Sequence, residues 1–293
     1  MFTATLIAAE ILQAGDISFA ADRLADAGVT NLSQSVVEPN KAVDLHFSGD
    51  ATAARQALEE AIPGVDVIVQ TTAHRRRTLI IADMDSTMIT VECIDELADY
   101  AGIKAKIAAV TEAAMRGELD FEGALRSRVV LLRGLPETAI EQCLAERVKI
   151  MPGARELIRT LRANGGFAVL VSGGFTRFAE PVGAEIGFDR VIANRLGITG
   201  GTLDGTVAHP IIGAQAKREA LAAAIAERGL RPEATLAVGD GANDIPMIEA
   251  AGLGVAYHAK PKTRAAASAA VLYGDLSAIL YAMGYPKSAW ATS

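Results

Sequence analysis

Four short apolar runs in the second part of the chain are typical of buried parallel strands, because no polar position alternates with the apolar ones. The runs cover residues 78–82, 167–171, 235–238 and 253–256. Helical patterns lie between them, at residues 154–163 and 217–228 among others. Strands that alternate with helices in this way predict an α/β fold built on a doubly wound parallel sheet.

A long helical segment interrupts this pattern after its first strand. Four stretches with helix-like periodicity follow one another between residues 92 and 149, with Gly102, Gly117 and Gly134 at the junctions. A crossover helix needs far fewer residues, so we predict an all-helical cap over the sheet edge. Residues 191–207 contain two glycine-rich turns between β-type residues and predict a hairpin or flap.

Residues 1–73 follow a different pattern, in the order strand, helix, strand, strand, helix, strand. This order matches the ferredoxin-like α+β arrangement. We therefore predict an N-terminal domain at residues 1–73, a catalytic core at 74–91 and 150–293, and the inserted cap at 92–149. The basic run at residues 75–77 lies at the first boundary and is interpreted as a solvated linker.

Composition and charge narrow the functional classes. Hydrophobic residues make up 51% of the chain and the net charge is −7. A nucleic-acid partner is not expected, because such proteins usually carry a basic stripe. No apolar run is long enough for a bilayer and no signal-peptide pattern is visible, so we expect a cytoplasmic protein without a membrane partner. Cys93 and Cys143 have no metal-ligand or redox spacing and are interpreted as buried thiols.

Carboxylates gather where two of the predicted strands end. Asp83 and Asp85 follow the first strand and are two residues apart, so they can face the same way. One carboxylate can attack phosphorus while the other moves the proton of the leaving alkoxide and later of water. Asp240 and Asp244 follow the third strand, and beside Asp83 they would form an oxygen-rich site suited to Mg²⁺. The alternative for the first motif is an Asp-rich turn after a strand, and the alternative for the second is a Gly-rich loop with surface acids.

Two further elements carry groups that can hold a phosphate. Ser172, Gly173 and Gly174 end the second strand and offer a hydroxyl and backbone N–H groups, although an ordinary turn would have the same sequence. Lys217 lies near the start of a helix and can hold a nucleophile and a phosphate together as a point charge. Taken alone, Lys217 has the pattern of a solvated helix residue.

The order of these motifs resembles that of the haloacid-dehalogenase superfamily, over about residues 78–260. The first and last motifs read DMDST at residues 83–87 and GDGANDIPM at residues 239–247. The resemblance implies that Asp83 is the nucleophile and Asp85 the acid/base, and that Ser172 and Lys217 bind the transferring phosphoryl group. It implies Mg²⁺ as the cofactor. The implied metal ligands are Asp83, Asp85 through its carbonyl oxygen, and Asp240, with Asp244 nearby.

Within the superfamily, the chain is similar to phosphoserine phosphatases, which implies O-phosphoserine as the substrate and serine biosynthesis as the process. The residues that carry this likeness are Glu92, Met115, Phe121, Arg128, Ser172, Gly173 and Asn243. A buried Glu92 would bind the substrate ammonium, and Arg128 would bind the carboxylate in a two-pronged fashion. Met115 and Phe121 either contact the substrate or belong to the core of the cap.

Two other interpretations stay open at this point. One is a related phosphatase or phosphotransferase for another small phosphate ester, which changes at Glu92 and Arg128 would distinguish. The other is an amino-acid-sensing regulatory protein with a vestigial site, against which the intact catalytic set argues. The N-terminal unit resembles an ACT-type regulatory domain, and the sequence leaves open whether it binds a ligand, forms a homodimer or has a structural role.

Overall fold

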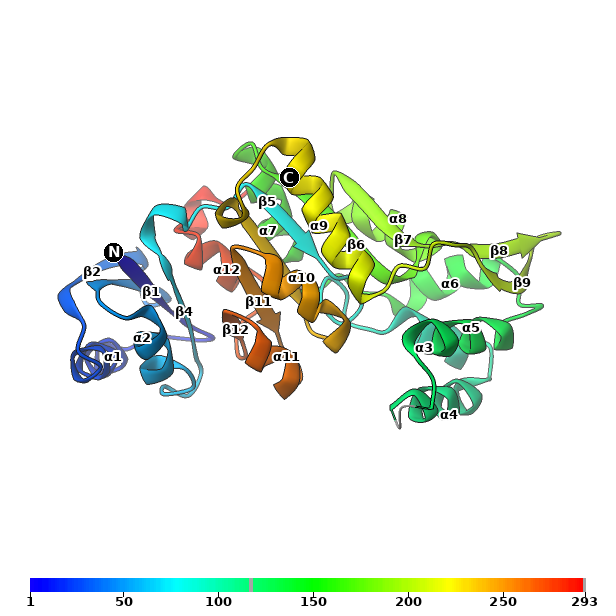
Figure 1. Cartoon of the computed structure of the whole chain (residues 1–293), viewed down its shortest axis with the longest axis horizontal. Coiled ribbons are helices and arrows are strands. Elements are labelled where there is room, and N and C mark those ends of the chain that lie inside the picture. Colours follow the sequence, from blue (N-terminus) through cyan, green and yellow to red (C-terminus); the bar gives the residue numbers. More distant parts are fainter. Residues whose placement is uncertain (116–117, 292–293) are drawn as a thin grey trace.

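The computed structural model describes residues 1–115 and 118–291, apart from the side chains of residues 114 and 115. Its parts lie in a row along the longest axis of the molecule (Figure 1). A four-stranded sheet with two helices forms one end, a six-stranded sheet with helices on both faces forms the middle, and the cap helices with a two-stranded hairpin form the other end. The predicted fold class is therefore confirmed.

The N-terminal sheet has the strand order β2-β3-β1-β4 and is antiparallel throughout. Its elements are β1 (Phe2–Ala8), α1 (Ala14–Asp26), β2 (Thr30–Glu38), β3 (Ala42–Ser48), α2 (Ala51–Leu58) and β4 (Val65–Thr71). Helix α2 begins where the Asp50 carboxylate accepts the backbone N–H groups of residues 52 and 53, a common N-terminal cap. Leu6, Leu45 and Leu58 are fully or almost fully buried where the two helices meet the sheet.

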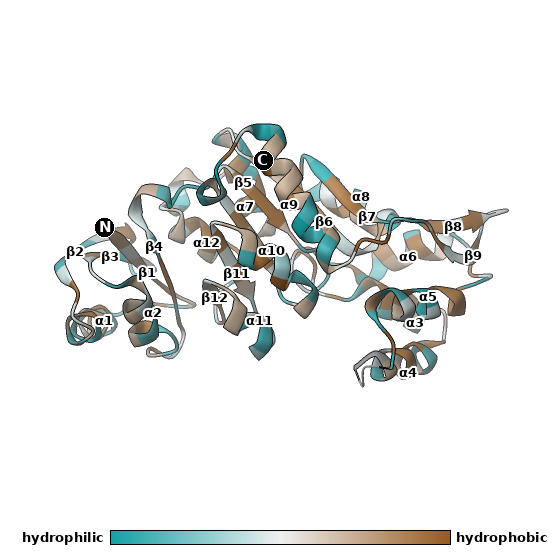
Figure 2. Ribbon diagram, viewed as in Figure 1, coloured by the Kyte–Doolittle hydropathy of each residue, from teal (hydrophilic) through white to brown (hydrophobic). Residues whose placement is uncertain are grey.

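The central sheet has the order β12-β11-β10-β5-β6-β7, and all its neighbouring strands are parallel. Its strands are β5 (Leu79–Ala82), β6 (Phe167–Phe175), β7 (Arg190–Asn194), β10 (Thr235–Gly239), β11 (Leu253–Tyr257) and β12 (Ala269–Val271). Figure 2 shows these strands as a hydrophobic layer inside the molecule. The apolar runs predicted β5, β6, β10 and β11, whereas β7 and β12 were not predicted as strands of this sheet because they are short, with five and three residues.

Helices cover both faces of the central sheet. They are α7 (Ala154–Ala163), α8 (Thr176–Ile186), α9 (Ala214–Arg228), α10 (Ile245–Ala250), α11 (Pro261–Ala266) and α12 (Ser277–Ala282). Ile80 packs with α7, α8 and α12 on one face, while the next residue, Ile81, packs with α9 and α10 on the other, as alternation along a strand requires. Among the described residues, no helix combines the length and the hydrophobicity needed to cross a bilayer.

The cap consists of α3 (Cys93–Tyr100), α4 (Lys104–Met115), α5 (Phe121–Leu131) and α6 (Thr138–Arg147). The hairpin β8 (Leu196–Thr199) and β9 (Thr202–Val207) projects from the core and reaches the loop after α5. There Leu203 accepts the N–H of Gly134 at 2.8 Å and donates its own N–H to Leu135 at 2.9 Å. The hairpin therefore joins the core to the cap through backbone hydrogen bonds.

The basic run at residues 75–77 connects the N-terminal sheet to the core through buried contacts, so its interpretation as a solvated linker was wrong. Arg77 is only 4% exposed and donates to the Glu233 carbonyl and to the Gln70 side chain, both at 3.0 Å. Arg75 forms an ion pair with Asp44 at 2.5 Å. A guanidinium carries five N–H donors, and each of these two donates to acceptors on both sides of the boundary.

A buried carboxylate strengthens the same boundary. Asp66, on β4, is 2% exposed and accepts the backbone N–H groups of Leu272, Tyr273 and Gly274 in the core, at 2.7, 3.1 and 2.8 Å. Such charge-assisted hydrogen bonds are stronger than neutral ones. The N-terminal sheet therefore has a fixed place against the core.

Candidate active site

The central strands bring the predicted chemical groups together at one edge of the sheet. Strand β5 lies between β10 and β6, and all three are parallel, so their carboxyl ends meet. Asp83 follows β5, Asp240 follows β10, and Ser172 lies near the end of β6. Ligands bind at this edge in open parallel sheets.

Lys217 forms the electrostatic centre of the site. It lies in the first turn of α9, its side chain is fully buried, and its Nζ is 2.6 Å from Asp83 Oδ1 and 2.7 Å from Asp244 Oδ1. Burial alone would lower the pKa of Lys217, but the two carboxylates outweigh burial and raise it. Lys217 is therefore a permanent charge inside the site rather than a solvated helix residue.

The Asp83 carboxylate is held through one of its two oxygens. Its Oδ1 accepts the N–H of Met84 at 2.7 Å in addition to the Lys217 ammonium. Burial, and after it the neighbouring Asp244, raise the pKa of Asp83 well above its usual range, and Lys217 only partly opposes them. A further cation at this position would favour the ionised carboxylate that nucleophilic attack needs.

Three carboxylates could hold that cation. One oxygen from each of Asp83, Asp240 and Asp244 lies within 4.8 Å of the others. Asp244 already uses both oxygens, one with Lys217 and one with the N–H of Gly241 at 3.0 Å. Burial, followed by Asp244 and Glu92, raises the pKa of Asp240 to about 6. A set of hard oxygen donors under mutual repulsion fits Mg²⁺, with Asp244 better placed as a support than as a ligand.

Asp85 is oriented by hydrogen bonds to both oxygens. Cys93 donates its N–H to Oδ1 at 2.9 Å, and Ser172 donates its hydroxyl to Oδ2 at 3.3 Å. Burial, followed by the charge of Glu92, raises the pKa of Asp85 to about 6, which suits a group that both gives and takes a proton. Gly174 allows this approach, because a Cβ there would lie 2.8 Å from Asp85 Oδ2.

A cavity of about 390 Å³ opens between this edge and the cap. Its walls include Asp83, Asp85 and Asp240 from the core and Glu92, Phe121 and Arg128 from the cap, together with Gly173 and Asn243. The Phe121 ring covers the phosphate turn, since a Cβ built on Gly173 would lie 3.2 Å from Phe121 Cζ. The size is typical of a pocket for a small molecule.

Glu92 and Arg128 both line the cavity but differ in exposure. Arg128 is partly buried, and burial lowers its pKa although Asp95, Glu92 and Asp85 oppose this. Glu92 is exposed, so the expectation of a buried Glu92 was wrong. It precedes α3 at the junction between core and cap, where solvent reaches it, and its Oε1 accepts the Ser86 hydroxyl at 2.8 Å. Met115 ends α4, and its side chain lies outside the described part of the structure.

Several residues of the site were missed in the sequence, including Asn194, Thr87 and Lys260. Asn194, almost fully buried at the end of β7, donates to the Gly173 carbonyl at 2.8 Å and accepts the N–H of Ile212, also at 2.8 Å. Thr87 donates its hydroxyl to Asp240 Oδ1 at 3.1 Å, and Lys260 lines the cavity. A polar residue that ends a strand is the one signal that would have pointed to Asn194.

The fold and the arrangement of these groups define a class of hydrolase. Residues 80–249 match the haloacid dehalogenase-like hydrolases. The chain belongs to this family, as the motifs at residues 83–87 and 239–247 had indicated.

Individual relatives within this family are phosphoserine phosphatases. Phosphoserine phosphatase SerB2 of Mycobacterium tuberculosis is 42% identical over 265 residues, which cover 90% of this chain and 63% of that protein. The phosphoserine phosphatase of a Polaromonas species is 44% identical over 69% of this chain and 88% of its own length. A crystal structure of a probable phosphoserine phosphatase from Vibrio cholerae, in its unliganded form, matches with a TM-score of 0.80 and 33% identity, over 98% of this chain and 88% of the other. The chain spans less than two thirds of the Mycobacterium protein.

Proposed function

We propose that this protein is a Mg²⁺-dependent phosphatase that hydrolyses O-phosphoserine to serine and phosphate. The observation that carries the proposal is the cavity itself, which has the Asp83–Lys217–Asp244 network at its base and Glu92 and Arg128 on its cap side. A phosphate would lie against the base, and an amino acid's ammonium and carboxylate would meet an acid and a guanidinium. The phosphoserine phosphatases among its relatives support the same substrate.

In this proposal Asp83 attacks phosphorus through Oδ2, because Oδ1 is held by Lys217 and the N–H of Met84. The bond between phosphorus and the serine oxygen breaks, and Asp85 gives its proton to the leaving alkoxide. The product at Asp83 is an acyl phosphate. Asp85, now ionised, takes a proton from water, which attacks phosphorus and releases phosphate and free Asp83.

The remaining groups neutralise and orient the phosphoryl oxygens. Lys217 supplies a fixed positive charge, and the turn that contains Ser172 and Gly173 supplies a hydroxyl and backbone N–H groups. Mg²⁺, when bound by Asp83, Asp240 and the carbonyl oxygen of Asp85, would neutralise charge that develops on the phosphoryl group. Asn194 keeps the turn in place relative to the segment that enters α9.

The substrate assignment is tested by removing the charge of Arg128 or of Glu92. We expect Arg128→Ala and Glu92→Gln to reduce kcat/KM for phosphoserine much more than for p-nitrophenyl phosphate, which has neither an ammonium nor a carboxylate. Loss of a hydrogen-bonded charge in a closed site costs about 2–5 kcal/mol, or roughly thirty-fold to several-thousand-fold. Because Glu92 is exposed, its effect should fall at the lower end of that range.

Matched controls separate selectivity from cap stability. Arg126→Ala removes an arginine from the same helix, and Glu112→Gln removes an exposed acid from α4; neither residue lines the cavity. Both controls should leave the ratio of the two kcat/KM values unchanged. Equal losses on both substrates with Arg128→Ala would contradict the assignment. In that case a panel of phosphorylated metabolites would identify which other small phosphate ester is used.

The role of the N-terminal unit stays a prediction, as does its likeness to ACT-type domains. Its four strands and two helices have the ferredoxin-like order, which fits that likeness without identifying a ligand. The domain division into residues 1–73, 74–91 with 150–293, and 92–149 also stays a prediction. A homodimer likewise stays a prediction.

A further inference from the structure

Lys260 is a cation of the cavity wall that the catalytic scheme does not use. Among the residues that the structure describes, two basic side chains line this cavity, Arg128 from the cap and Lys260 from the core. Arg128 is partly buried, whereas Lys260 is exposed and therefore lies at the mouth. Within the described part of the chain, the structure records no ion pair for its ammonium group.

Because most charged residues of the cavity wall are acidic, a cation there would favour the binding of an anionic substrate. The acidic residues that line it are Asp83, Asp85, Glu92, Asp95 and Asp240. A phosphate ester that carries two negative charges is repelled by this wall until it reaches the base of the site. A positive charge at the mouth raises the local concentration of anions and their rate of association.

The backbone fixes where Lys260 stands. It is the residue before α11, and its carbonyl accepts the N–H groups of Thr263 and Arg264, both at 3.0 Å, in the first turn of the helix. Upstream, His258 donates its N–H to Val271 at 2.9 Å and so ties the loop to β12. The position of Lys260 therefore depends on the position of α11.

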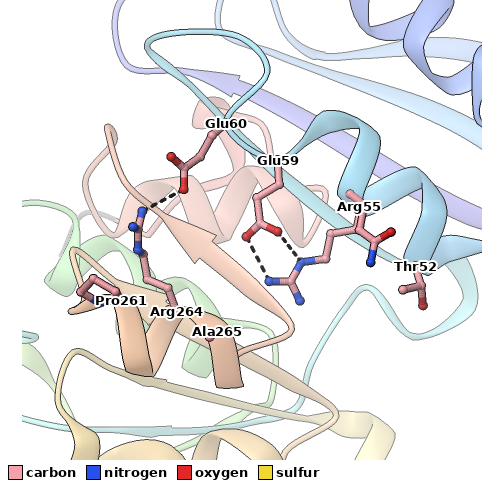
Figure 3. Close-up of a pocket in the computed structure, with 8 residues that line it drawn as sticks. Thr52, Arg55, Glu59, Glu60, Pro261, Arg264 and Ala265 are labelled. Carbon is pink, nitrogen blue, oxygen red and sulfur yellow. Dashed lines mark hydrogen bonds and ion pairs between the residues drawn. The ribbon is translucent and has the colours of Figure 1, made fainter.

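The N-terminal unit contacts α11 and the residue that follows it. Arg264 on α11 forms an ion pair with Glu60 at 2.9 Å, and Arg55 on α2 donates to the Ala267 carbonyl, just after α11, at 2.7 Å. Figure 3 shows Arg264 reaching Glu60 across a cleft of about 410 Å³ between the two units, while Arg55 pairs with Glu59 on the N-terminal side of the cleft. Helix α11 (Pro261–Ala266) is thus attached to the N-terminal unit at its C-terminal end, through Arg264 in its last turn and the carbonyl of Ala267.

We propose that Lys260 captures the phosphate of the substrate at the mouth of the cavity, and that the N-terminal unit positions Lys260 through α11. Lys260 acts on the phosphate charge and not on the serine part. The inference rests on the proposed phosphatase activity, but it does not depend on phosphoserine being the substrate.

The first test compares Lys260→Ala with Lys262→Ala. Lys262 lies on α11, is also exposed and does not line the cavity. At low ionic strength, Lys260→Ala should lower kcat/KM about three- to ten-fold with kcat unchanged, because a rim charge acts mainly on association. Near 0.5 M salt, where charges are screened within about 4 Å, the kcat/KM of Lys260→Ala should approach that of the wild type. Lys260→Arg should restore wild-type values, and Lys262→Ala should have no effect.

The second test asks whether Glu60→Gln raises or lowers kcat/KM. Glu60→Gln removes a negative charge, so a pure field effect would speed the capture of an anion. Loss of the contact with Arg264 should instead lower kcat/KM, by about two-fold, since exposed ion pairs contribute little. This decrease should vanish in the Lys260→Ala background. An increase, or a decrease that persists in that background, would overturn the positioning role.

The two substrates make the outcomes separable. Both phosphoserine and p-nitrophenyl phosphate should lose kcat/KM with Lys260→Ala, whereas Arg128→Ala should affect phosphoserine much more than p-nitrophenyl phosphate. If the wild type hydrolyses p-nitrophenyl phosphate but not phosphoserine, the proposed substrate fails while Lys260 can still be measured. Unchanged kcat/KM, or a loss confined to kcat, in Lys260→Ala would overturn the capture role.

Discussion

Replacing Lys217 by methionine would test the electrostatic design of the site most directly. The side chain is fully buried and forms two short contacts, 2.6 Å to Asp83 and 2.7 Å to Asp244. Methionine keeps most of the volume but leaves two buried carboxylates without their cation. Removal of one partner from a buried ion pair typically costs about 3–5 kcal/mol, against a total stability of about 5–15 kcal/mol for a folded protein.

Urea denaturation followed by circular dichroism measures this cost in the metal-free protein. Arg218→Met is the matched control, because Arg218 is the next residue on α9 and is exposed, and it should change the free energy of unfolding by less than about 0.5 kcal/mol. Lys217→Met combined with Asp244→Asn should recover part of the loss, since it removes one of the unpaired charges. A change below about 1 kcal/mol in Lys217→Met would refute the view that Lys217 neutralises the two carboxylates.

Two further predictions concern the carboxylates. Asp83→Asn should keep the fold, measured by circular dichroism, and reduce kcat by several orders of magnitude, since the amide is a poor nucleophile; turnover near that of the wild type would contradict its role. Burial raises the pKa values of Asp85 and Asp240 to about 6 from 3.8, so between about pH 3.8 and 6 the folded state holds more protons than the unfolded state. Metal-free stability should therefore fall as pH rises through this window, by up to about 3 kcal/mol for each group. Because Mg²⁺ competes with those protons, it should raise the melting temperature more at pH 7.5 than at pH 5, and an equal or smaller rise at pH 7.5 would count against the metal site.

The order of the strands and helices could be predicted from the sequence because the burial of each element leaves its own pattern of apolar residues. Strands β5, β6, β10 and β11 are buried on both faces, so each appears as an uninterrupted apolar run. Helix α7 was predicted with its observed bounds for a related reason, since its apolar positions recur with the period of a helix. Short edge elements such as β12, with three residues, carry too few positions for any period to show.

Much of the site was readable for a topological reason. In a parallel sheet the carboxyl ends of neighbouring strands share an edge, so residues that follow the strands are brought together whatever the distance along the chain. Asp83, Ser172 and Asp240 could be placed at one edge on this basis. In the structure they lie at or near the carboxyl ends of the neighbouring strands β5, β6 and β10.

Only the tertiary structure decided which charges are buried and which are not. Lys217 and Arg77 look like surface residues in the sequence, yet both are buried, because segments far along the chain supply their partners: Asp83 and Asp244 for Lys217, and the Glu233 carbonyl for Arg77. Glu92 was expected to be buried and is exposed. The burial of a charge depends on whether distant groups compensate its loss of hydration. The residues next to the charge in the sequence do not identify those groups.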